Sequence, residues 1–233
     1  AAQGTAEGEI YRTLRRLGAE HAAEIDRRFP KILRRVGGYN LDEFVPGKPF
    51  NLARMLVGSE GTLAAVVEAT VNLEPVPRFV GLCVVHFHDL IESLASTPAI
   101  LECRPCAVEL MDRMMLDLTK QTGGMARMMD FVAGEPDAIL MVEFYGETRE
   151  ELEAQLDRLI AHVKPKIPAY HYWRSTDPAV LSNIWKVRKA GVGILQAMRG
   201  DAKAIAFVED TAVSPDRLAD YIRRFRQIVA DHG

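Results

Sequence analysis

The sequence has little of several features that would mark a specialised class of protein. Cysteine is scarce and odd in number, three in 233 residues, which excludes a disulfide-held fold and favours a reducing compartment, the cytoplasm. Apolar runs fall far short of the roughly 20 residues that a membrane-spanning helix needs. Neither charge dominates, since 29 basic residues face 32 acidic ones, which argues against nucleic-acid or membrane-surface binding through bulk charge.

The chain also lacks an initiating methionine and opens AAQGTAEGEI, without the basic region, apolar stretch and cleavage site of a secretory signal. We therefore expect a trimmed chain or an internal piece of a longer protein. The length suffices for one large domain or two small ones, with a core that needs neither disulfides nor metal.

The first third of the chain reads as a helical region followed by loops and a strand. Apolar residues recur at helical spacing over 9–29, and residues 34–52 are rich in turn formers. Valine, alanine and threonine over 62–73 alternate, which predicts a strand. Pro75 and Pro77 then mark the best candidate linker.

After the linker, strand and helix patterns alternate with several short connections. This order predicts an α+β fold over 78–233, a ferredoxin-like α/β sandwich with helices on one face of a largely antiparallel sheet. The expected strands are 79–87, 99–103, 138–145, 169–173 and 203–208, and the expected helices are 89–96, 107–122, 148–163, 177–198 and 214–233.

Gly58-Ser59-Glu60-Gly61-Thr62 is the most informative short motif. Glycine lets the backbone turn tightly and approach a flat or phosphate-bearing ligand, and the hydroxyls add donors. The spacing does not complete a phosphate-loop or dinucleotide fingerprint, so these residues alone favour a plain loop entering a strand over a ligand-binding loop.

Longer stretches carry a family resemblance. GYNL at 38–41, LVGSEGTLAAVVEATVNLEPVP at 56–77, LSNIWKVRKA at 181–190 and FVEDTAVSP at 207–215 resemble the FAD-linked oxidases. That family includes D-lactate dehydrogenases, the glycolate oxidase FAD subunit and 2-hydroxyglutarate dehydrogenases. In detail the chain is similar to the FAD-binding part of large bacterial fusion oxidoreductases that also carry iron–sulfur ligands.

The resemblance implies that residues 1–77 end a FAD-binding domain and that 78–233 form an incomplete substrate cap. It implies oxidation of a lactate- or glycolate-like 2-hydroxy acid to the 2-oxo acid, with hydride transfer to FAD. The family's glycine-rich pyrophosphate loop and its histidine motif do not occur in the chain, so we expect an inactive internal fragment. The residues implied to line the flavin are Gly58, Ser59, Gly61, Thr62, Tyr39 and Asn40.

Arg188 has a physical argument of its own. It stands four residues after Ile184 and four before Val192, so helical spacing places it on the apolar stripe of its helix. A buried guanidinium needs an anion, either a ligand carboxylate or a structural partner such as Glu209 or Asp210. The resemblance implies that Arg188 is the catalytic and substrate-binding arginine, with Asp210 supporting the substrate site.

Other constellations are weaker. His86 and His88 share one strand face, and Cys103 and Cys106 have redox-motif spacing, but neither pair has further ligands, so we predict no metal site. The alternative to an enzyme is a cofactor-free α/β docking or dimerisation module. For the enzyme, an iron–sulfur domain or subunit is one candidate electron acceptor; the sequence leaves both the acceptor and the oligomeric state, a homodimer included, open.

Overall fold

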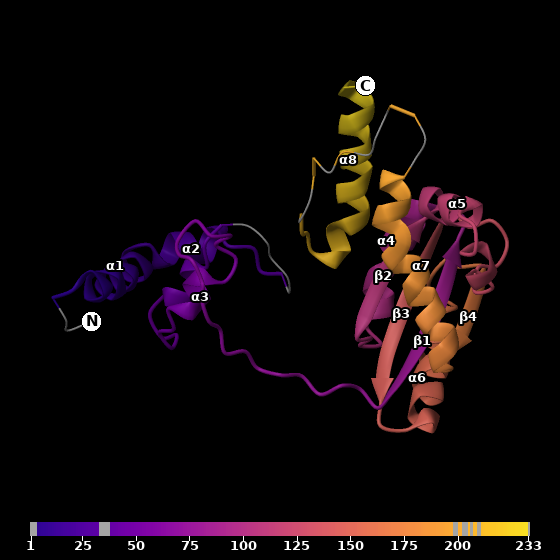
Figure 1. Ribbon diagram of the computed structural model, residues 1–233, viewed down its shortest axis with the longest axis horizontal. Helices are drawn as coiled ribbons and strands as arrows, with labels where there is room; N and C mark the ends of the chain where they lie inside the picture. The colour runs from indigo at the N-terminus through magenta and orange to yellow at the C-terminus, as the bar shows by residue number, and fades with distance from the viewer. Residues whose placement is uncertain are drawn as a thin grey trace. The chain divides into compact units, whose positions relative to one another are not determined.

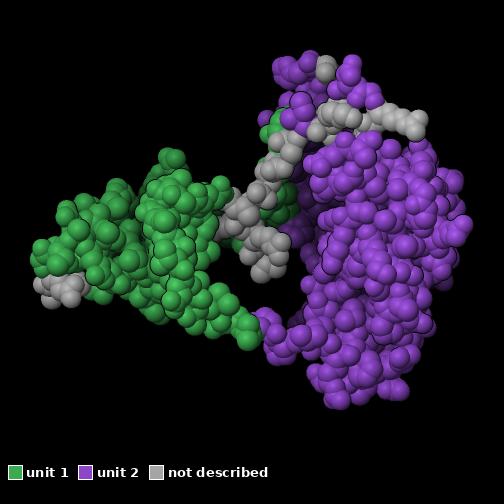
Figure 2. Space-filling view, in the orientation of Figure 1, with its two compact units in different colours: residues 1–73, 207–214 green, residues 74–206, 215–233 purple. Residues whose placement is uncertain are grey.

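The computed structural model describes residues 4–32, 38–197, 200–201, 205, 207–208 and 211–232. The chain divides into two compact units, coloured separately in Figure 2. Unit 1 comprises residues 1–73 and 207–214, and unit 2 comprises residues 74–206 and 215–233. Each unit has its own buried apolar side chains and is described by itself.

Unit 1 is helical. Its elements are α1 (Ala6–Glu20), α2 (Ala22–Arg28), the 3-10 helix η1 (Leu41–Phe44) and α3 (Ala53–Leu56). The Thr5 hydroxyl caps α1 by accepting a hydrogen bond from the Gly8 N–H. Phe44 is buried and packs edge-on against Phe50, which stacks on Tyr11 of α1. The helix predicted over 9–29 is therefore present as two helices.

The strand predicted over 62–73 is wrong. These residues carry no strand, and the side chains of Val66, Val67 and Leu73 are exposed. A strand is stable only when a neighbouring strand pairs with its backbone, and the alternating pattern reports side-chain preference alone. Here the described segment has no paired strand beside it, so the pattern produces extended chain.

Unit 2 contains a four-stranded antiparallel sheet in the order β2-β3-β1-β4. Helices α4 and α6 connect the strands, so the chain runs β1-α4-β2-β3-α6-β4, as in a ferredoxin-like sandwich (Figure 1). The predicted α+β class and antiparallel sheet are confirmed. The bounds are β1 Phe79–Phe87, α4 Leu90–Leu101, β2 Ala107–Asp112, β3 Ala138–Gly146, α6 Arg149–Val163 and β4 His171–Ser175.

Helices cover both faces of this sheet, whereas the sequence predicted helices on one face. One apolar core joins the sheet to Ile100 of α4 and to Leu156 and its neighbours in α6. The other joins the sheet to α5 (Arg113–Gln121) and α7 (Pro178–Gln196), for example through Leu116 and Ile184. The remaining elements of unit 2 are η2 (Ala126–Met128), η3 (Pro215–Arg217) and α8 (Leu218–His232), and α8 packs on α4.

Two predicted elements of unit 2 have the wrong type. The strand expected over 99–103 is the end of α4, and the helix expected over 107–122 begins as β2 before α5 starts at Arg113. Glu, Leu and Met favour helices locally, but pairing with β3 holds 107–112 extended. The strand predicted over 203–208 falls largely outside the described residues.

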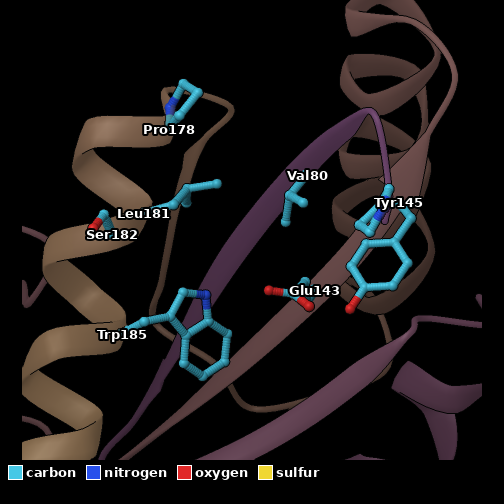
Figure 3. Close-up of a pocket in the computed structure, with 8 residues that line it drawn as sticks. Val80, Glu143, Tyr145, Pro178, Leu181, Ser182 and Trp185 are labelled. Carbon is cyan, nitrogen blue, oxygen red and sulfur yellow. The ribbon is translucent and has the colours of Figure 1, made fainter. Parts of the chain in front are cut away.

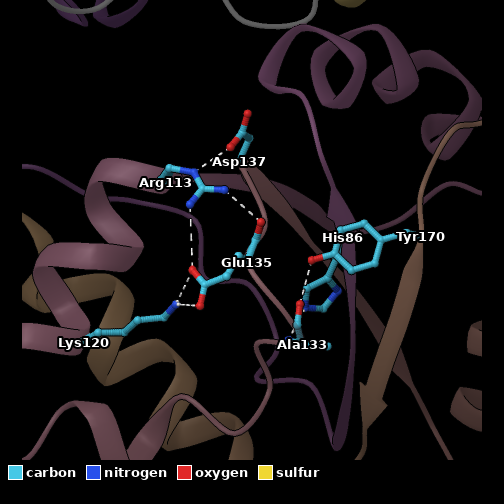
Figure 4. A network of polar contacts seen from close by, with 7 residues as sticks. All are labelled: His86, Arg113, Lys120, Ala133, Glu135, Asp137 and Tyr170. Carbon is cyan, nitrogen blue, oxygen red and sulfur yellow. Dashed lines mark hydrogen bonds and ion pairs between the residues drawn. The ribbon is translucent and has the colours of Figure 1, made fainter.

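Polar contacts fix the loop that precedes β3 (Figure 4). The Arg113 guanidinium donates to the Asp137 carboxylate at 2.6 Å and to the Glu135 carbonyl at 2.9 Å, and Lys120 pairs with the Glu135 carboxylate at 3.1 Å. The Tyr170 hydroxyl donates to the Ala133 carbonyl at 2.6 Å. The loop is thus tied to both α5 and the chain entering β4.

Candidate functional site

The glycine motif of unit 1 forms a tight loop immediately after α3. Gly58, Glu60 and Gly61 all have left-handed backbone angles, with φ of 80°, 50° and 75°. Glycine adopts this region freely, while Glu60 does so at a cost of about 1 kcal/mol. The Thr62 N–H and hydroxyl both donate to the Ser59 carbonyl, at 2.9 and 2.5 Å, which closes the turn.

Tyr39 and Asn40 brace this loop, so the structure brings together the six residues implied to line the flavin. The Asn40 side-chain amide donates to the Arg54 and Val57 carbonyls, at 2.9 and 3.0 Å. The Tyr39 and Thr62 hydroxyls lie 2.9 Å apart. Because Thr62 uses its own proton on Ser59, the Tyr39 hydroxyl is the donor in this bond.

The exposed side of the loop fits the close approach of a flavin or a phosphate. No atom lies within 4 Å of the position that a Cβ would take at Gly58 or Gly61. In the described part of the chain, the Glu60 and Gly61 N–H groups have no hydrogen-bond partner. Consecutive N–H groups of this kind can donate to an anionic oxygen or a ring heteroatom.

In unit 2, α7 and the sheet place Arg188 beside Glu109. The Arg188 Nε donates to Glu109 Oε2 at 2.5 Å, across 79 residues of sequence. Their side chains are 43% and 36% exposed, so neither charge is buried. Within the described ranges, Glu109 is the sole ion-pair partner of Arg188, and no residue there accepts a hydrogen bond from its two terminal nitrogens.

The sequence predicted that Arg188 lies on the apolar stripe of α7, and this prediction is wrong, because Arg188 lies beside the stripe. The stripe runs through Ile184, Val187 and Gly191, all buried, while Val192 is 63% exposed. Steps of three and four residues are both neighbours on a helix face, so spacing alone does not choose between Val187 and Arg188. A Cβ at Gly191 would lie 3.1 Å from Met115 Sδ of α5, so α7 packs closely against α5 on this face.

Next to this pair, a pocket of about 330 Å³ opens between α7 and the strands β1 and β3 (Figure 3). Glu143 on β3 points into it, toward Trp185 of α7 and Tyr145. Burial raises the pKa of the Glu143 carboxyl; hydrogen bonding from Tyr145 and Trp185 opposes this rise, and the charge of Glu109 adds to it. The other lining residues are Pro77, Val80, Pro178, Leu181 and Ser182.

The structure gives less support to a functional role for the remaining residues that the sequence singled out. Asp210 and Glu209 lie outside the described residues. His86 is fully buried, whereas His88 is exposed and stacks on Tyr170, so the two imidazoles do not form a pair. Cys103 and Cys106 are free thiols. No group of three or more His, Cys, Asp or Glu side chains that could hold a metal occurs in the part of the chain that the structure describes.

Sequence reasoning missed Glu109 and Glu143. Glu109 was assigned to a helix, and Glu143 stands in an otherwise apolar strand, where its neighbours Val142 and Phe144 face the opposite side of the sheet. A charged residue inside a buried strand was the available signal, since such a residue is rarely buried without a partner or a role.

Comparison with known proteins relates the whole chain to flavoenzymes. The family model "FAD linked oxidases, C-terminal domain" matches residues 76–233. D-2-hydroxyglutarate dehydrogenase from Pantoea ananatis is 31% identical over 98% of this chain and 24% of its own length. The Escherichia coli protein of the same name is 32% identical over 97% of this chain and 23% of its own.

A more distant relative, D-lactate dehydrogenase from Anaerostipes hadrus, is 24% identical over 78% of this chain and 38% of its own length. The chain therefore spans about a quarter of the D-2-hydroxyglutarate dehydrogenases that it matches. Among the described helices, none has the length and apolarity needed to cross a membrane. Because the family model covers more than half of its residues, the chain belongs to the FAD-linked oxidases, through their C-terminal domain.

Proposed function

We propose that this chain is part of a flavin-dependent oxidoreductase that converts a 2-hydroxy acid to the 2-oxo acid. The observation that carries the proposal is the Arg188 guanidinium, which is half-exposed and tethered through Nε. Its two terminal nitrogens have no hydrogen-bond partner among the residues that the structure describes. A planar guanidinium in this state suits a two-pronged bond to a carboxylate. The family membership supports the flavin, and the relatives named D-2-hydroxyglutarate and D-lactate dehydrogenase support the substrate class.

In this proposal the two units have different tasks. Residues 1–77 supply the end of a FAD-binding domain, in which Gly58, Gly61 and the braced Thr62 line the flavin. Residues 78–233 supply the substrate cap, in which Arg188 holds and orients the carboxylate of the hydroxy acid, with Asp210 beside the substrate. When bound, FAD accepts the hydride of the substrate α-carbon. Orientation by a fixed arginine lowers the entropic part of the barrier.

The decisive experiment combines flavin content with turnover. The intact gene product is purified and its bound FAD is measured by absorbance after release, and reduction of a dye is then followed with lactate, glycolate and 2-hydroxyglutarate. We expect FAD near one per chain and dye reduction that depends on the hydroxy acid. The alternative, a cofactor-free docking or dimerisation module, predicts neither result.

The role of Arg188 predicts a selective kinetic defect. Arg188→Met keeps the length of the side chain but removes the fork, so we expect the Michaelis constant for the hydroxy acid to rise at least tenfold. FAD content is expected to stay unchanged. A variant that loses FAD or fails to fold, with substrate affinity intact in the protein that remains, would show that Arg188 is structural.

We further propose a cytoplasmic location and an iron–sulfur domain or subunit as electron acceptor. The three free thiols support a reducing compartment. A homodimer is tested by light scattering of the intact protein, and the acceptor is tested by iron and acid-labile sulfide analysis of the same sample.

A further inference from the structure

The sheet holds the backbone of Glu109 in a fixed position. Its strand, β2, pairs with β3, and the residue opposite Glu109 in that pairing is Met141, which is fully buried. Met111, two residues along the same face, is 2% exposed. The backbone that carries the Glu109 carboxylate is therefore fixed by the sheet, while Arg188 has a long side chain with several rotatable bonds.

The contact between the two side chains engages Nε, one of the three guanidinium nitrogens of Arg188. Glu109 Oε2 accepts from Nε of Arg188, and a guanidinium carries five N–H donors. Engaging Nε from the sheet side restrains the plane of the guanidinium and leaves the edge formed by the two terminal nitrogens turned away from Glu109. That edge has the geometry that a carboxylate or phosphate ligand accepts in a two-pronged bond.

The pair is a weak candidate for stabilising the fold. Both side chains are more than a third exposed, and exposed ion pairs contribute about 0–1 kcal/mol. The two cores of unit 2 consist of apolar residues, and neither includes Glu109 or Arg188. A role in orientation explains the contact better than a role in stability.

A second carboxylate makes this orientation necessary. Glu143 lies on the same sheet face as Glu109, because Glu109 faces Met141 and Glu143 is two residues further along β3. Such diagonal neighbours are about 7–8 Å apart. Glu143 has no ion-pair partner among the described residues, and the charge of Glu109 is one of the causes that raise the pKa of Glu143. Without Glu109, Glu143 would be the other carboxylate that β2 and β3 present on this face.

We propose that Glu109 is a positioning residue: it holds Arg188 by Nε, keeps the guanidinium away from Glu143 and presents the free edge to the carboxylate of the substrate. This inference rests on the proposed role of Arg188 in substrate binding. It assigns to Glu109 an effect on substrate affinity that acts through Arg188 and involves no contact with the substrate.

The test compares Glu109→Leu and Glu109→Gln in the intact, flavin-loaded protein. We expect Glu109→Leu to raise the Michaelis constant at least tenfold with kcat changed less than threefold, because oriented binding is lost while the chemistry is retained. Glu109→Gln keeps an acceptor for Nε and is expected to fall between Leu and the original residue. The matched control is Glu153→Gln, which breaks an ion pair with Arg174 elsewhere on unit 2 and is expected to leave both constants unchanged.

The double variant Glu109→Leu, Glu143→Gln tests the competition directly. If Arg188 turns to Glu143 when Glu109 is absent, Glu143→Gln will recover at least threefold of the lost affinity, a non-additive result. Binding can be followed without turnover by titrating the 2-oxo acid against the fluorescence of Trp185, one turn before Arg188. A Trp173→Phe background leaves Trp185 as the one tryptophan of residues 1–233.

The outcomes separate the two proposals. If Arg188→Met weakens substrate binding but Glu109→Leu leaves the affinity within twofold, the positioning role is overturned and the proposed function stands. If Arg188→Met itself has no effect on affinity, the substrate role of Arg188 falls and the inference about Glu109 falls with it. A loss of FAD or of cooperative unfolding in both Glu109 variants would assign Glu109 to the fold.

Discussion

His86 lies in β1, fully buried between the sheet and the loop that leads to β3 (Figure 4). Nε2 lies 3.2 Å from the backbone N of Ala133 and 3.1 Å from the Phe131 carbonyl oxygen. Nδ1 lies 3.3 Å from the His171 carbonyl oxygen, so both ring nitrogens have backbone partners. Burial, with a contribution from the charge of His171, lowers the pKa of His86 to about 4.

This burial predicts a loss of stability in mild acid. Because the pKa of His86 is lower in the folded state than the ordinary 6.5, its contribution is complete above about pH 6.5 and disappears as the pH falls through 4. The loss amounts to at most about 3 kcal/mol. It is measured by urea unfolding between pH 7 and pH 4.5.

The matched variants are His86→Gln and His88→Gln, since His88 is the exposed histidine two residues on. The His86 variant is expected to be less stable at pH 7 but to depend less on pH than the original chain. The His88 variant should keep the original pH dependence. Parallel pH profiles for all three proteins would contradict the assignment of the effect to His86.

At the scale of helices, two glycines illustrate how packing overrides local preference. Gly18 in α1 touches η1 so closely that a Cβ would lie 2.1 Å from the Phe44 carbonyl oxygen. Gly193 in α7 is exposed and has no atom within 4 Å of the same position. In a helix interior, alanine is more favourable than glycine by about 1 kcal/mol, and this holds at both sites. Only the site of Gly193 has room for the alanine side chain.

We therefore expect opposite effects from the same substitution. Gly18→Ala should destabilise the packing of α1 on η1 by about 2–3 kcal/mol, since a backbone carbonyl cannot move aside as a side chain can. Gly193→Ala should be neutral or stabilising by up to about 1 kcal/mol. Thermal unfolding followed by circular dichroism measures both, and a stabilised Gly18→Ala variant would refute the close contact.

At the scale of the whole chain, two units are joined through a segment without regular structure. In this segment the side chains of Val67, Leu73 and Val76 are 98%, 88% and 89% exposed. The boundary between the units falls after Leu73, and the family model begins at residue 76. Extended, exposed chain is the preferred substrate of proteases.

Limited proteolysis is expected to separate the units. A glutamate-specific protease should cut first after Glu68, which lies in this exposed segment of unit 1. Glu74 is followed by Pro75, and the later glutamates of unit 2 lie largely in helices and strands. The fragment that begins at Ala69 should retain a cooperative thermal transition, since both cores of the sheet lie within it. First cleavage inside α6, or a fragment that unfolds without cooperativity, would show that unit 2 depends on unit 1.

Local signals were sufficient for much of unit 2. The apolar run over 79–87 coincides with β1, and the Thr148 and Asp177 caps begin α6 and α7 where the sequence predicted. Motif resemblance identified the family. The cap and strand signals depend on neighbours within a few positions, and the motifs are read directly from the chain, so the sequence by itself determined both.

Only the tertiary structure decided the rest. Residues 107–112 became a strand because β3 lies beside them, and 62–73 did not become one because no paired strand does. The pairing of Arg188 with Glu109 joins residues 79 positions apart, and it depends on strand order and on the close approach of α7 to α5. Such contacts arise from the packing of distant segments, and no local pattern encodes which distant segment will be the partner.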